Sequence, residues 1–172
     1  MATILPPFPR LVFTILEPLS LYVSTLLFYQ QVTDSIRSIA GWLAPIMDPH
    51  AFISDQVLHN FPQDLTLGAH VVALQLSNVY LLLALLGVAV LYTTSEPKVV
   101  RNYIIALWIA DIGHLAATYY VVGYKHFIDV GHWNSMAWGN IGATVFLFVT
   151  RSAYLMGLFG NDRSAGKRKA KG

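Results

Sequence analysis

One apolar stretch with two ionisable residues near its middle limits the folds open to this chain more than any other feature. Residues 101–124, RNYIIALWIADIGHLAATYYVVGY, are long and apolar enough to cross a bilayer, which takes about 20 helical residues. Asp111 and His114 lie within this stretch, one helical turn apart. Because ionisable groups at that depth are costly, they mark a candidate functional site. We therefore expect a membrane protein with a site inside the membrane.

The composition agrees with a membrane protein. Of the 172 residues, 55% are hydrophobic and 12% are charged, whereas a typical soluble domain carries about 25% charged residues. The chain has no cysteine, which excludes disulfides, thiolate metal ligands and cysteine nucleophiles. The spacing of histidines and acids matches no metal motif, and glycine-rich phosphate loops are absent. We therefore predict no metal, no cofactor and no nucleic-acid partner.

Four apolar segments predict the fold class, which is an all-α, polytopic membrane protein with four transmembrane helices in an antiparallel bundle. A single domain should cover residues 1–160, followed by a basic tail over residues 161–172. Residues 1–9 are expected to be a non-helical lead-in, and Asn134 or Ser135 should cap the last helix. The four helices are expected at about residues 10–31, 68–92, 99–122 and 135–159.

The first apolar segment has a second interpretation, a cleaved signal peptide. Signal peptides have a shorter and cleaner apolar core, whereas Glu17 and Pro18 interrupt this one. We therefore favour a membrane helix. Pro18 lacks a backbone N–H and clashes with the preceding turn, so it should kink this helix near Thr14.

Residues 32–67 form the long connection between the first two helices. Within it, residues 36–47 fit either an amphipathic helix on the membrane surface or a loop packed over the end of the bundle. Residues 48–67 are rich in Asp, His, Pro and Asn and are expected to be loop.

Basic residues predict the orientation in the membrane. Four spans place both termini on one side, and that side carries Arg10, Lys98, Arg101 and the basic tail. The positive-inside rule puts this side in the cytosol and the connection over residues 32–67 in the lumen. We take the endoplasmic reticulum membrane as a working assumption, with the lipid bilayer as partner and a homo-oligomer as an open alternative.

Depths counted along each helix at about 1.5 Å per residue sort the polar residues into two layers. Glu17 lies about 10 Å and Arg151 about 12 Å from the cytosolic end, so they are expected to pair between the first and last helices. The deeper layer begins about 17 Å from that end and holds Asp111, His114, Gln75 and Asn78. We expect it to be a site of its own rather than a set of partners for Arg151.

The deeper layer carries the candidate acid–base chemistry. Asp111, tuned by His114, could give or take a proton near neutral pH, and the alternative is a hydrogen-bond network between helices. Glu17 is the third candidate catalytic residue, or else half of a structural ion pair. The candidate substrate-binding residues are Gln75, Asn78, Trp133, Asn134, Trp138, Asn140 and Arg151. For the two tryptophans, an aromatic belt at the membrane interface is the alternative.

Four sequence blocks carry a resemblance to a known family. They are LVFTILEPLS, LQLSNVYLLL, DIGHLAATYY, and HWNSMAWGNIG with the later TRSAYLMGL, and they cover most of residues 8–159. Together they resemble a fungal family of small four-span membrane proteins, whose genes are often met near secondary-metabolite clusters. This resemblance implies a lipophilic substrate.

A more distant similarity is to the emopamil-binding-like superfamily, which includes sterol double-bond isomerases that act through residues in an intramembrane cavity. The residues with a similar mixture of side chains are Glu17, Asp111, His114, Asn134 and Trp138. The span number and the motif spacing differ, so this similarity implies the chemistry by analogy.

The leading hypothesis from the sequence is an intramembrane acid–base isomerase or cyclase of an isoprenoid- or sterol-like compound. The alternative is a non-catalytic membrane scaffold or lipid-binding protein, in which the polar residues hold helices together. A third class, a proton- or ion-conducting channel, needs a continuous polar path across the membrane.

Overall fold

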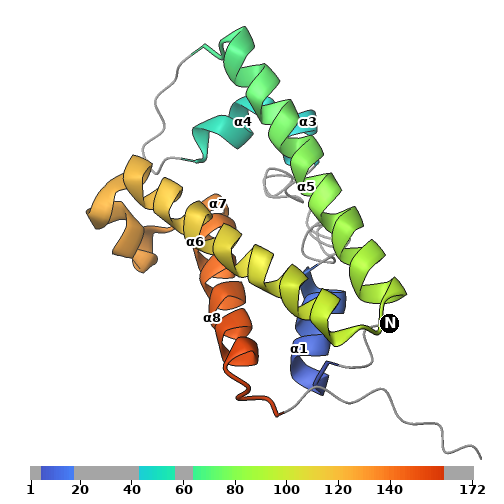
Figure 1. Ribbon diagram of the computed structural model, residues 1–172. Helices are drawn as coiled ribbons and strands as arrows, with labels where there is room; N and C mark the ends of the chain where they lie inside the picture. The colour runs from blue at the N-terminus through green and yellow to red at the C-terminus, as the bar shows by residue number, and fades with distance from the viewer. Residues whose placement is uncertain (1–4, 18–42, 57–63, 161–172) are drawn as a thin grey trace, which may run out of the picture.

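The computed structural model describes residues 5–17, 43–56 and 64–160, and it confirms an all-α fold for these ranges (Figure 1). Labels with η denote π- or 3₁₀-helical segments. In chain order the elements are α1 (Pro7–Leu11), η1 (Val12–Leu16), α3 (Ala44–Met47), α4 (Pro49–Ser54), α5 (Leu67–Thr93), α6 (Pro97–Ile128), η4 (Val130–His132), α7 (Ser135–Ala137), η5 (Trp138–Ala143) and α8 (Thr144–Leu155).

The first helix begins earlier than the sequence suggested. It starts at Pro7, so the prediction of a non-helical lead-in over residues 1–9 is wrong for the last part of that range. Pro7 fits the first helical position because the N–H that it lacks would have no partner inside the helix there. The helix then continues without a gap from α1 into η1. The part of the predicted helix beyond residue 17 lies outside the described residues.

The expected distortion near Thr14 takes the form of the π-helical segment η1. Because Pro18 has no N–H, the Thr14 carbonyl lacks its usual donor four residues later. The Tyr92 hydroxyl of α5 donates a hydrogen bond to this carbonyl at 2.8 Å. The Thr14 hydroxyl donates to the Arg10 carbonyl at 2.6 Å. A side chain of α5 thus supplies a hydrogen-bond donor to the Thr14 carbonyl of the first helix.

The long connection contains a helix that the sequence did not lead us to expect. α4 lies within residues 48–67, so the prediction of loop is wrong there. Asp48 caps α4 by accepting a hydrogen bond from Ala51 N at 2.8 Å, and Pro49 occupies the first turn. The Asp48-Pro49 pair is a helix-start signal that the sequence analysis overlooked. Of the range 36–47, the described residues include the short helix α3.

Two long apolar helices follow. α5 has 27 residues and begins at a Thr66 cap, whose hydroxyl accepts from Ala69 N at 3.1 Å. α6 has 32 residues and extends past the end predicted at residue 122. Gly123 interrupts α6 with φ 76° and ψ 166°, a conformation open essentially to glycine alone. The predicted end therefore corresponds to a break, after which the chain continues helically in a new direction.

The last helical stretch runs from α7 through η5 to α8. Asn134 accepts a hydrogen bond from Ala137 N at 2.8 Å, which makes Asn134 the cap among the two predicted candidates. The stretch ends before the predicted residue 159. Gly157 adopts φ 76°, and the N–H of Leu158 turns back to the Ala153 carbonyl at 3.0 Å, which closes the helix.

The helices converge at one end of the molecule (Figure 1). α6 packs along α8, and α1 contacts α8. α5 meets α6 near the turn that joins them and then diverges, while α3 and α4 pack against α5. The buried core at the converging end consists of Leu5, Val12, Phe13, Leu91, Val100, Ile104 and Tyr154. This core adjoins the charged residues of the candidate site.

Candidate functional site

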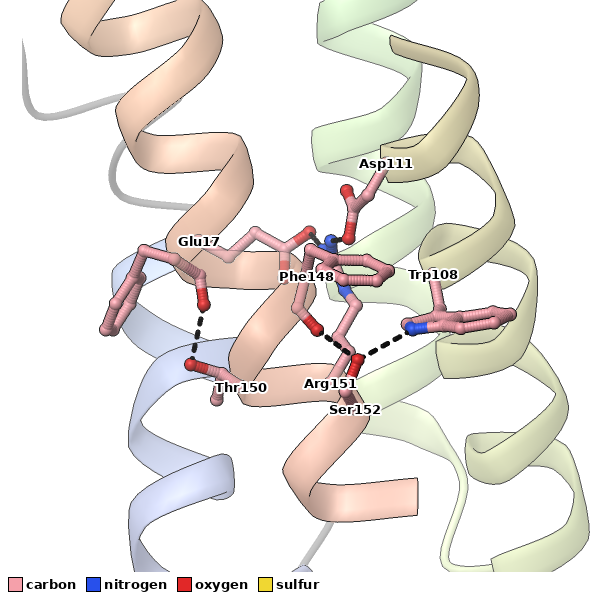
Figure 2. A network of polar contacts seen from close by, with 8 residues as sticks. Glu17, Trp108, Asp111, Phe148, Thr150, Arg151 and Ser152 are labelled. Atoms are coloured by element: carbon pink, nitrogen blue, oxygen red, sulfur yellow. Dashed lines mark hydrogen bonds and ion pairs between the residues drawn. The ribbon is translucent and has the colours of Figure 1, made fainter. Parts of the chain in front are cut away.

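Three charged side chains from distant parts of the sequence meet between the helices (Figure 2). Arg151 of α8 donates from Nη1 to Oδ2 of Asp111 on α6, and from Nη2 to Oε1 of Glu17, which directly follows η1. The exposed fraction of the side chain is 2% for Arg151, 10% for Asp111 and 16% for Glu17. We call Glu17, Asp111 and Arg151 the Arg151 triad.

One aromatic ring, that of Phe13, lies near the guanidinium of Arg151. The guanidinium Cζ lies 5.9 Å from the ring centroid of Phe13, a cation–π distance. Phe13 in turn meets Tyr154 edge to face, with the ring centroids 6.1 Å apart. The buried Nε–H of Arg151 has no hydrogen-bond partner among the described residues. A guanidinium so far from water needs anionic partners, because desolvating an unpaired charge costs several kcal/mol.

A second set of contacts fixes α6 against α8 beside the triad (Figure 2). The indole N–H of Trp108 donates to Ser152 Oγ at 2.8 Å, and Ser152 Oγ donates to the Phe148 carbonyl at 2.8 Å. The rings of Trp108 and Phe148 are stacked, with centroids 5.7 Å apart. Trp108 lies one turn before Asp111, and Ser152 directly follows Arg151. These contacts therefore hold the register that brings Arg151 to Asp111.

Of the two predicted polar layers, the structure confirms the pairing in the shallower one and corrects the separation of the deeper one. Glu17 and Arg151 form the predicted ion pair. The expectation that Asp111 forms a site separate from Arg151 is wrong, because the two are also paired. Their predicted depths differ by only about 5 Å, or one helical turn, and an extended arginine side chain spans that distance. Arg151 therefore forms ion pairs with both Glu17 and Asp111.

The other residues of the deeper layer do not gather around Asp111. Gln75 and Asn78 are exposed on α5, and no hydrogen bond joins them to Asp111 or His114 in the described part of the chain. α5 diverges from α6 along this part of its length (Figure 1). His114 is half-buried and lies one turn from Asp111 on the same helix. The expected four-residue layer is thus reduced to Asp111 and His114.

The remaining predicted site residues form a second polar cluster near the start of the last helical stretch. Asn134 Nδ2 donates to the Asp55 carbonyl at 2.9 Å, and Asn140 Nδ2 donates to Gln56 Oε1 at 2.6 Å. Both asparagines therefore tie the end of α4 to the region of α7 and η5. Asn140 precedes Arg151 by about three helical turns, roughly 16 Å. Asn134 and Asn140 therefore lie in a cluster separate from the Arg151 triad.

Two tryptophans pack beside this second cluster. Trp133 and Trp138 meet edge to face with ring centroids 5.1 Å apart, and the indole N–H of Trp133 donates to the His126 carbonyl at 3.1 Å. A Cβ on Gly142 would lie 2.8 Å from the Trp138 ring, so the ring would have to shift to admit any other residue there. The adjoining cleft has room for about one water molecule, and it is lined by Gln56, Thr118, Val122, His126, Asn134, Ala137, Asn140 and Ile141.

Some residues of the triad's surroundings were not among the predicted site residues. Trp108 could have been found, since Ile104, Trp108 and Asp111 follow the i, i+4, i+7 spacing of one helix face. Tyr92 could not, because its bond to the first helix depends on how α5 packs. Gln56 was assigned to a loop, so its contact with Asn140 was also missed.

The fold and the site together define an all-α protein with two long apolar helices and a buried ionic triad that joins three helical segments. The chain belongs to the family described as a domain of unknown function, DUF7704, whose sequence profile matches residues 26–161. Asp111 and Arg151 lie inside the matched range, and Glu17 lies before it. No curated protein and no solved structure matches the chain.

Proposed function

We propose that this protein is a four-span integral membrane protein that serves as a membrane scaffold or lipid-binding protein. Its partners are the lipid bilayer and lipophilic molecules within it. The distribution of Lys and Arg along the chain supports cytosolic termini. The endoplasmic reticulum membrane is kept as the working location.

The long helices α5 and α6 support the membrane location. Both are long and apolar enough to cross a bilayer, with mean hydropathies of 2.1 and 1.4 over their most apolar windows. Only 22% and 11% of these windows are buried inside the chain. The core helix of a soluble protein is mostly buried, and these two helices instead present apolar side chains outward, as a lipid-facing helix does.

Two further segments complete the proposed four spans. The stretch from Ser135 to Leu155 is about 30 Å long at the rise of a helix, which matches the hydrocarbon layer. The N-terminal span begins with α1 and η1. The charged residues on these two segments, Arg151 and Glu17, face each other inside the bundle, as charged residues of membrane helices do.

The observation that carries the scaffold proposal is the engagement of both acids by Arg151. One guanidinium ties the end of η1 to α6 and α8, and each acid is held in an ion pair. Asp111, the leading catalytic candidate, therefore has a structural role that accounts for its depth. Buried ionic groups of this kind select one helix arrangement, because any other arrangement leaves a charge without a partner.

A second candidate function is the intramembrane acid–base isomerase or cyclase of an isoprenoid- or sterol-like compound. The observation that favours it is that two carboxyl groups, which are common general acids, meet at one guanidinium inside the proposed bundle. In a double-bond shift, a carboxylic acid would protonate one alkene carbon, and a base would remove a proton from a neighbouring carbon. Glu17 or Asp111 would be the acid, and His114 is the candidate base.

Replacing all three triad residues by apolar residues distinguishes the scaffold function from the isomerase or cyclase function. The variant Glu17→Met, Asp111→Leu, Arg151→Met removes every charge of the triad and keeps the side chains bulky. It would be expressed in a strain that lacks the gene, and lipids and metabolites would be profiled against the intact gene. Lys98→Met, which removes an exposed cationic side chain, is the matched control.

The scaffold proposal predicts that the triple variant folds in membranes and restores the profile of the intact gene. A triple variant that is folded, as judged by its thermal transition in detergent, and still gives the deletion profile contradicts the scaffold proposal. That second result is the one that the enzyme candidate predicts.

A further inference from the structure

The cleft in the second polar cluster has the size and the lining of a site for one small polar group. Three parts of the chain line it, which are Gln56 after α4, one face of α6 around Thr118 and His126, and the stretch from Asn134 to Ile141. It has room for about one water molecule and is partly open to the outside. The described residues that line it include no carboxylate, ammonium or guanidinium group. A ligand group that fits this cleft is therefore small and uncharged.

Gln56 and Asn140 have hydrogen-bonding capacity to spare at this cleft. Asn140 lies in the π-helical segment η5, and such segments are frequent at functional sites. Its Nδ2 donates to Gln56 Oε1 at 2.6 Å. Each amide has two N–H donors and one carbonyl acceptor, so this contact leaves Asn140 Oδ1 as an acceptor and Gln56 Nε2 as a donor. Neither of these groups bonds to another residue in the described part of the chain. The two amides together therefore offer both an acceptor and a donor to a ligand.

Two neighbouring polar side chains narrow the choice of ligand. The Thr118 hydroxyl donates its single proton to the His114 carbonyl at 2.9 Å, so it can act toward the cleft only as an acceptor. Asn134 uses its amide within the fold, because it accepts a backbone N–H of α7 and donates to the Asp55 carbonyl. Asn134 is therefore a positioning residue that holds the end of α4, and with it Gln56, at the cleft. The acceptors in the cleft favour a ligand group that carries an O–H donor.

The proposed topology places the cleft near the lumenal edge of the hydrocarbon layer. Asn140 lies about 8 Å along the helix from Ser135, where the last proposed span begins. Trp133 and Trp138 pack together beside the cleft, and amphipathic aromatic rings are enriched at this level of a membrane. The apolar residues of the lining are Val122, Ala137 and Ile141. A molecule bound here can place a polar end in the cleft and an apolar chain in the bilayer.

We infer that this cleft is a binding site for the hydroxyl group of a lipophilic alcohol, held by Gln56 and Asn140. A hydroxyl group both donates and accepts, so its oxygen accepts from Gln56 Nε2 while its proton goes to Asn140 Oδ1. It also fits a space of about one water molecule, whereas a carboxylate or phosphate head group is larger and charged. This site rests on the lipid-binding form of the proposed function and names the class of lipid.

The thermal midpoint of the purified full-length protein in detergent tests the site, with n-decanol as the probe and its methyl ether as the matched compound. A ligand that binds only the folded state raises the midpoint. n-Decanol should raise it by several degrees more than the ether does, because the ether oxygen has no proton to donate. Gln56→Leu and Asn140→Leu should each remove this difference. Asn102→Leu, which removes an exposed amide from α6, is the matched control and should keep it.

Equal midpoints of the intact protein in n-decanol and in the ether would overturn the alcohol site and would leave water as the source of any hydroxyl group there. This comparison needs no variant, so it stays decisive where a leucine variant does not fold. A difference that persists in Gln56→Leu or in Asn140→Leu would overturn the role of the two amides. Either result leaves the scaffold function standing, since the triad variants test that function separately.

Discussion

The Arg151 side chain is only 2% exposed, and its guanidinium forms an ion pair with Asp111 through one terminal nitrogen and with Glu17 through the other. An arginine suits this role because its planar fork can address two acids at once, which a lysine ammonium does less well. The desolvation of three ionisable groups makes the cluster costly, so its contribution lies in selecting one arrangement of helices and not in adding stability.

A single hydroxyl group at position 92 should have a measurable effect at the distorted first helix. Tyr92→Phe removes the donor to the Thr14 carbonyl, which Pro18 leaves without its usual partner. We expect the free energy of unfolding to fall by about 1–2 kcal/mol, the cost of an unsatisfied buried acceptor. Thermal or denaturant unfolding in detergent measures it. Tyr120→Phe is the control because Tyr120 is 88% exposed, and equal effects of the two variants would contradict the assignment.

The exposed pair of Asp129 and His132 gives a pH prediction outside the proposed membrane spans. Asp129 lies 2.9 Å from His132 Nδ1, and this hydrogen bond raises the pKa of His132 above its ordinary value. Because the folded-state pKa is raised, the stabilisation is fully present below the unfolded-state pKa and is lost as pH rises through the folded-state pKa. An NMR titration of the imidazole checks this. Asp129→Asn should lower the pKa of His132, and no change in that variant would count against the pair.

At the scale of elements, the break in α6 at Gly123 directs the chain from the long helix toward the second polar cluster. Gly123→Ala should lower the free energy of unfolding by about 1–3 kcal/mol, because its conformation strains any residue with a Cβ. Gly113→Ala is the matched control in the same helix, where an added Cβ would meet no described atom within 4 Å. That control should be neutral or slightly stabilising. Equal destabilisation by both variants would argue against the break.

Elements whose signals are local could be predicted from the sequence. The second helix was expected at residues 68–92 and covers Leu67–Thr93, because a continuous apolar run and a cap define it. The sequence analysis missed that helices begin at Pro7 and at Pro49, because residues 1–9 showed no helical pattern and residues 48–67 were assigned to loop on their composition. Proline opens helices, where its missing N–H does no harm.

The candidate site was only partly predictable because it depends on packing between elements. Equal depth was enough to predict that Glu17 pairs with Arg151. The contact of Arg151 with Asp111 depends on the reach of the arginine and on how α6 lies against α8. Gln75 was placed near Asp111 on the assumption of a closely packed bundle, whereas α5 diverges from α6 (Figure 1).

At the scale of the whole molecule, the proposed topology can be tested directly because the chain has no cysteine. Ser164→Cys places a thiol in the basic tail, and His132→Cys places one in the loop before α7. With four spans, a membrane-impermeant maleimide should label the two variants from opposite sides of the membrane. Labelling of both from the same side would contradict the topology.

The central claim, that Arg151 sets the helix arrangement by satisfying two buried acids, is tested most directly by the unfolding free energy of two variants. Arg151→Met alone leaves the acids without a partner and should lower the unfolding free energy by about 3–5 kcal/mol. The triple variant Glu17→Met, Asp111→Leu, Arg151→Met should recover at least most of that loss, because no buried charge remains. The exposed Lys98→Met control should stay within about 0.5 kcal/mol of the intact protein. An Arg151→Met variant as stable as the intact protein would contradict the claim.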